Sequence, residues 1–165
     1  MRIHPFVLVV APCAISVALI VQAQSPKAGL YEVSSKMTWQ HSPFPEGMQA
    51  PSGSGGPHTT QVCVTQAQID KYNGPKPSAH GGNCQVGNIQ KNQHGMTAEI
   101  TCGVPMTGKG KVETTWTDSG HSKSKVHFTG SMKMGQESKT IEWTVQSQST
   151  FKGGNCGGVK PADEK

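Results

Sequence analysis

The amino-acid sequence predicts an all-β domain, a mainly antiparallel meander in a curved or barrel-like sheet, with one short helix and disulfide staples. Three observations support this prediction. Several segments alternate between apolar and polar residues, two stretches have the symmetry of hairpins, and four cysteines follow an apolar N-terminal segment. Alternation is typical of strands that bury one face and expose the other.

The N-terminal segment has the features of a secretion signal. Arg2 precedes an apolar run from Phe6 to Val21, and Val21-Gln22-Ala23 offers the small residues that a signal peptidase accepts. The run is too short and too early for a membrane-spanning helix, although an uncleaved anchor is the alternative. We therefore expect residues 1–23 to be a signal peptide cleaved near Ala23. The protein is then periplasmic or secreted, and not transmembrane after cleavage.

Removal of residues 1–23 from the 165-residue chain leaves 142 residues, with 14 Lys and Arg against 10 Asp and Glu. This length fits one β-rich domain over residues 24–158, followed by a charged tail at 159–165 that we expect to be disordered. Apolar residues are sparse in this part of the chain, so the core must be thin. Disulfides commonly compensate for a thin core in secreted domains.

The first half of the domain contains two strands and a helix. Leu30–Trp39 alternates with Tyr31 and Trp39 on the apolar side, which predicts a half-buried strand. Residues 41–57 are rich in Pro, Gly and Ser and predict a flexible loop. A short strand over Thr59–Val64 follows.

The predicted helix begins directly after the second strand. Thr65 has the position of an N-cap, with Gln68 three residues later as in a capping box. The helix should run for one or two turns and end at Tyr72.

The next segment predicts a hairpin and a disulfide. If Cys84–Gln90 pairs with Met96–Cys102 about Gln93, the two cysteines face each other on one side of the sheet. We therefore predict the bridge Cys84–Cys102, which leaves Cys63–Cys156 as the second. Metal binding is the competing use of four cysteines, but their spacing contains no C-x-x-C pair.

A second hairpin is centred on Ser119, and a further strand follows it. The hairpin places Val112 and Trp116 inward on its first strand and Val126 inward on its second. For the next turn we expect a four-residue loop over Gly135–Ser138. That loop would place Ile141 opposite Met132 and Trp143 opposite Gly130.

In order and spacing, these segments resemble a bacterial family of small exported proteins known as the domain of unknown function 3617 family. The motifs that carry the resemblance are Lys27–Val33, Thr60–Thr65, Asn83-Cys84, Thr101-Cys102, Pro105–Gly110 and the terminal Gly154–Cys156. The likeness spans nearly the whole chain after residue 23, with Tyr31 at a position often held by tryptophan. It implies export and a β-rich fold. It supplies no catalytic residues.

The motif content does not favour an enzyme. The sequence contains no G-x-S-x-G elbow, no H-E-x-x-H, no phosphate-binding loop and no dinucleotide fingerprint. We therefore expect no catalytic residues and no cofactor, and keep a hydrolase as the second alternative only. A periplasmic metal-handling protein is the first alternative, because His and Met side chains are numerous and suit copper. Their spacing is scattered, and we assign no metal ligand.

The most specific surface feature is a set of basic residues on the outward side of the second hairpin, which we call the lysine face. It consists of Lys109, Lys111, Lys123, Lys125, His127 and Lys133. One interpretation is that these residues have no partner and simply keep the exposed sheet soluble. The set can also bind an anionic partner, such as an anionic lipid or an acidic glycan outside the cytoplasm. We expect no nucleic acid as a partner in that compartment, and the face also lacks stacking aromatics.

The sequence therefore favours a non-enzymatic exported domain that binds an apolar ligand or an anionic envelope component. The apolar ligand would require a hollow sheet interior lined by inward tryptophans, namely Trp39, Trp116 and Trp143.

Overall fold

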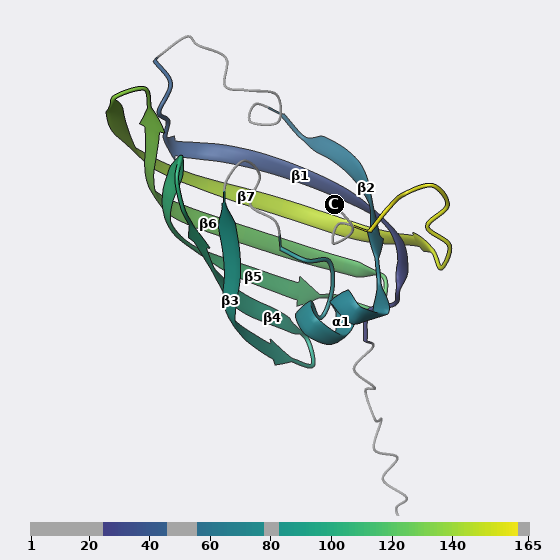
Figure 1. Ribbon diagram of the computed structural model, residues 1–165. Helices are drawn as coiled ribbons and strands as arrows, with labels where there is room; N and C mark the ends of the chain where they lie inside the picture. The colour runs from purple at the N-terminus through teal and green to yellow at the C-terminus, as the bar shows by residue number, and fades with distance from the viewer. Residues whose placement is uncertain (1–24, 46–55, 78–82, 162–165) are drawn as a thin grey trace, which may run out of the picture.

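The computed structural model describes residues 25–45, 56–77 and 83–161 (Figure 1). The predicted signal peptide, residues 46–55 of the predicted loop and residues 162–165 of the predicted tail lie outside the described residues. Within the described part of the chain, no helix has the length and apolarity that crossing a membrane demands.

Seven strands form one antiparallel sheet in the order β2-β1-β7-β6-β5-β4-β3. The strands are β1 (Gly29–His41), β2 (His58–Val64), β3 (Cys84–Asn92), β4 (Gly95–Cys102), β5 (Met106–Trp116), β6 (His121–Met134) and β7 (Glu137–Gly153). The strands β3 to β7 form a meander, and β1 inserts between β2 and β7. The predicted antiparallel meander with one short helix is confirmed.

The sheet is strongly curved but not closed into a barrel, because β2 and β3 are its two edges (Figure 1). The edge at β2 is partly covered by the end of the chain, where Pro161 forms a parallel bridge with Cys63. Two disulfides, Cys63–Cys156 and Cys84–Cys102, link the pairs that we predicted from the sequence.

The helix α1 (Gln66–Tyr72) lies at one end of the sheet and defines its inward face (Figure 1). It begins with the predicted capping box, in which the Thr65 side chain accepts from the backbone of Gln68 and the Gln68 side chain accepts in return. Its far end is tied to the sheet, because the Trp116 indole donates to the carbonyl of Asn73 over 2.6 Å.

Inward side chains form two apolar clusters. One cluster gathers around Tyr31, Ile69 and Trp116 near the helix. The larger one covers the middle and far end of the inward face and includes Phe128 and Trp143. Alternation along each strand therefore leaves an outward face of polar side chains on the other side of the sheet.

The second predicted hairpin has the expected centre at Ser119, and the first has the expected centre at Gln93 only from Cys84 to Gly87. Cys84 pairs with Cys102 and Val86 with Ile100, although a bulge between Gly87 and Gln90 shifts the rest of β3 by one residue. In the second hairpin, Val112 pairs with Val126 as predicted.

The predicted register of β6 and β7 is wrong by two residues. We expected a four-residue loop over Gly135–Ser138, whereas the strands join through two residues, Gly135 and Gln136, with Met134 opposite Glu137. The reason is local: Gly135 has φ +65°, a conformation that favours glycine and permits a tight hairpin turn.

The corrected register changes both expected pairs. Met132 lies opposite Lys139 rather than Ile141, Gly130 lies opposite Ile141, and Trp143 lies opposite Phe128 rather than Gly130. Because the shift is an even number of residues, every side chain stays on its predicted face.

Candidate functional site

The lysine face lies on the outward side of β5 and β6. Lys109 and Lys111 project from β5, and register pairs Lys111 with His127 on β6. Their positions follow from alternation, because their neighbours Gly110, Val112 and Phe128 belong to the inward face. The inward apolar residues thus determine which way the cations point.

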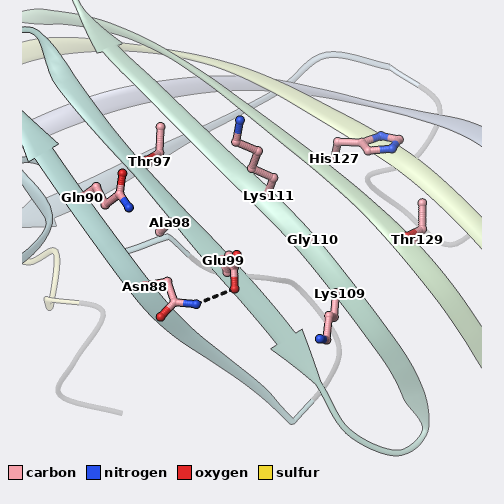
Figure 2. Close-up of a pocket in the computed structure, with 10 residues that line it drawn as sticks. All are labelled: Asn88, Gln90, Thr97, Ala98, Glu99, Lys109, Gly110, Lys111, His127 and Thr129. Atoms are coloured by element: carbon pink, nitrogen blue, oxygen red, sulfur yellow. Dashed lines mark hydrogen bonds between the residues drawn. The ribbon is translucent and has the colours of Figure 1, made fainter.

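A hollow of about 640 Å³ opens on this face and extends from β3 to β6. Figure 2 shows Lys109, Lys111 and His127 on one side of it and polar side chains of β3 and β4 on the other. The polar lining includes Asn88, Gln90, Thr97 and Thr129. Amide and hydroxyl groups both donate and accept hydrogen bonds, so this lining suits a polar ligand.

Two carboxylates near the hollow are already engaged. The Asn88 amide donates to Glu99 over 2.6 Å, and Lys111 forms an ion pair with Glu113 with 2.7 Å between Nζ and Oε1. The hydrogen bond from Lys111 is the main cause that lowers the pKa of Glu113 from its ordinary value. Lys109, in contrast, has no carboxylate within ion-pair distance among the described residues.

A second hollow of about 290 Å³ lies beside the first on the outward face of β6, β7 and β1. Lys125 lines it from β6 and Lys36 lines it from β1, with Thr38, Gln40, Thr144 and Gln146 around them. Lys36 was not part of the lysine face predicted from the sequence. It lines this hollow because β1 pairs with β7, a contact between the two ends of the chain that no local pattern reveals.

The boundary between the two hollows is built from hydrogen-bonded side chains. His127 Nδ1 lies 3.3 Å from Thr144 Oγ1, and its Nε2 lies 3.6 Å from Glu142 Oε1. The other oxygen of Glu142 contacts His41 Nδ1 at 2.8 Å. Two histidines thus flank one carboxylate.

Two of the predicted residues lie away from the hollows. Lys123 is on the same face, opposite Thr115, two residues beyond Lys125 along β6. Lys133 is opposite Ser138 near the β6–β7 turn, about 20 Å from His127 at the rise of a β-strand. The structure therefore brings together Lys109, Lys111, Lys125 and His127 and leaves Lys133 apart.

Residues 26–156 match the family described as "Protein of unknown function (DUF3617)". The chain belongs to this family. The comparisons with curated proteins and with solved structures gave no match. Membership in DUF3617 therefore accounts for the whole described sheet but assigns no activity to the lysine face.

Other predicted sites in this DUF3617 chain can be located as well. In the ranges that the structure describes, no group of three or more His, Cys, Asp or Glu side chains is arranged to hold a metal ion. His80 and Met48, which entered the metal-handling alternative, lie outside those ranges.

The three tryptophans of the DUF3617 domain all point inward. Trp116 and Trp143 are buried in the two apolar clusters, and half-buried Trp39 packs edge-on against Phe44. The indole nitrogen of Trp39 is buried without a hydrogen-bond partner.

Proposed function

We propose that this protein is an exported, non-enzymatic binding domain that holds an anionic component of the cell envelope on its lysine face. The observation that carries the proposal is the pair of adjacent polar hollows edged by Lys109, Lys111 and Lys125 on one rigid sheet. Neither Lys109 nor Lys125 has an ion-pair partner within 4 Å among the described residues, although Lys125 lies opposite Glu113 and its charge helps to lower the pKa of that carboxyl.

Export is part of the same proposal. The N-terminal apolar segment supports it, and so do the two disulfides, because disulfides persist in oxidising compartments outside the cytoplasm. Signal cleavage near Ala23 is tested by N-terminal sequencing of protein recovered from the periplasm or medium.

Binding can be tested with charged and neutral probes. We expect the mature protein to bind vesicles that contain an anionic lipid, or an acidic polysaccharide such as polygalacturonate, and not zwitterionic vesicles or dextran. Binding should weaken as salt rises, since the Debye length falls from about 10 Å at 0.1 M to about 3 Å at 1 M ionic strength.

A matched pair of variants locates the site. The triple variant Lys109→Gln/Lys111→Gln/Lys125→Gln should lose most of the binding. The control Lys27→Gln/Lys71→Gln/Lys160→Gln removes the same charge from positions outside the strands of the sheet and should retain it. Equal loss in both variants, or no salt-sensitive binding at all, would contradict the proposal.

A second candidate is an apolar ligand on the inward face. It is favoured by one row of half-buried apolar side chains, Met37, Val145 and Val126, on three neighbouring strands. Nile red fluorescence should then rise on addition of the native protein. The triple lysine variant should give the same rise, because the inward site does not depend on the lysines. An unchanged spectrum with the native protein would exclude this candidate.

A further inference from the structure

The two hollows on the outward face form one track that crosses the strands. The first hollow spans β3 to β6, and the second spans β6, β7 and β1. They meet where His127 and Thr144, partners in the β6–β7 register, are joined through their side chains. The track therefore covers six neighbouring strands of the sheet.

The length of the track sets the size of ligand that it can hold. Six neighbouring strands are separated by five steps of about 4.8 Å, so the track is about 24 Å long. That is much longer than a single phosphate or carboxylate, and long enough for several sugar residues. It lies on strands that are paired on both sides except at β3, so the ligand meets a preorganised surface.

The track carries cations, neutral polar groups and one carboxylate, Glu99, which accepts a hydrogen bond from Asn88. Lys109 and Lys111 lie on β5, the third of the six strands, Lys125 lies on β6, the fourth, and Lys36 lies on β1 at one end of the track. Threonine hydroxyls and glutamine amides lie between and around them, including Thr129, Thr144, Thr38, Gln40 and Gln146. Lysine ammonium groups bind carboxylates and sulfates, and hydroxyls and amides exchange hydrogen bonds with sugar hydroxyls.

A membrane surface fits this face less well. Proteins that rest on bilayers insert apolar or aromatic side chains among the headgroups. On the described strands, the outward positions carry no Phe, Tyr or Trp. Among described residues the exposed large hydrophobics are Val104 and Met134, which lie at the end of the sheet and outside the track.

We propose that the ligand of this track is a linear acidic glycan that lies across the strands from β3 to β1, with its acidic groups on Lys36, Lys109, Lys111 and Lys125. The inference rests on the proposed function and specifies its ligand class.

The experiment is a length series of oligogalacturonates measured by calorimetry with the mature protein. Affinity should rise with chain length until the oligomer spans both hollows and then level off, because linked contacts act as one multivalent ligand. Lys36→Gln and Lys109→Gln should each lower the affinity for the longest oligomer by about two- to fivefold. This is the range expected for the loss of one exposed ion pair. The double variant should combine both losses.

The controls separate failure of this inference from failure of the proposed function. Lys27→Gln/Lys160→Gln should bind every oligomer as the native protein does, and circular dichroism should show that all variants are folded. If anionic vesicles bind in a lysine-dependent manner while oligomer length has no effect, the glycan inference is overturned and the proposed function stands. If neither probe binds, both are overturned. If Lys109→Gln lowers the affinity for the oligomer and Lys36→Gln does not, the ligand occupies only the first hollow, and the inference is also overturned.

Discussion

The ring of Phe128 stacks on the ring of Trp143, with centroids 5.1 Å apart and planes 13° from parallel. Both residues are buried, and they are register partners on β6 and β7. His127, which directly precedes Phe128 on β6, projects to the opposite face and lines the first hollow. The inward stack therefore fixes the strand that carries part of the outward site.

Loss of the Phe128 ring should strongly destabilise the domain. Phe128→Ala leaves a cavity in the larger apolar cluster and removes the stacking contact, so we expect the free energy of unfolding to fall by about 3–5 kcal/mol. Urea denaturation followed by tryptophan fluorescence measures this change. Phe44→Ala, which removes a half-buried ring, should cost clearly less. A smaller effect at Phe128 than at Phe44 would show that the stack is not central to the core.

Gly130, the one glycine of β6, should not tolerate a side chain. A Cβ atom there would lie 2.2 Å from the carbonyl oxygen of Thr107 and 3.0 Å from the Phe128 ring. Gly130→Ala should therefore destabilise the protein by about 1–3 kcal/mol, the usual effect of overpacking. Gly87→Ala is the matched control, since nothing lies within 4 Å of its Cβ position. We expect that control to be neutral or slightly stabilising in the same denaturation assay, because alanine loses less backbone entropy.

Local symmetry made most of the sheet predictable. The centres at Gln93 and Ser119 each determine several cross-strand pairs, because each hairpin closes over a few residues. The β6–β7 turn was harder, since the difference between a two- and a four-residue loop depends on the backbone conformation of Gly135.

The candidate site was predictable only in part. Lys109, Lys111 and Lys125 follow from one hairpin, whereas Lys36 reaches them through the pairing of β1 with β7. That pairing joins residues more than a hundred positions apart, and no pattern within either strand encodes it. The hollow itself also involves Asn88, a residue at the bulge in β3 with φ +49°.

The two disulfides should differ in their contribution to stability. Cys63–Cys156 closes a loop with a sequence separation of 93, and Cys84–Cys102 one of 18. Loop-closure entropy gives about 4.7 kcal/mol for the longer loop and about 3 kcal/mol for the shorter. The double variant Cys63→Ala/Cys156→Ala should therefore unfold at lower urea concentration than Cys84→Ala/Cys102→Ala. The reverse order would indicate that the local hairpin bridge is the more important one.

The turn that joins β5 to β6 should make the stability of the folded protein depend on pH. The Asp118 carboxylate accepts from the backbone nitrogens of Gly120 and His121 at 2.7 and 2.9 Å, and from the His121 ring. The hydrogen bond from Gly120 is the main cause that lowers the pKa of Asp118 below its ordinary value of 3.8. A carboxylate with a lowered pKa stabilises the folded state while it is ionised.

This stabilisation is complete above the ordinary Asp pKa and is lost as pH falls through the lower folded-state pKa. Asp118→Asn keeps an oxygen acceptor but removes the charge, so it should be less stable than the native protein at pH 7. The difference should shrink as pH is lowered below about 3.8. Urea denaturation at several pH values measures it, and an NMR titration of the Asp118 carboxyl measures the pKa directly. A stability difference that stays constant across this range would show that the charge of Asp118 does not stabilise the turn.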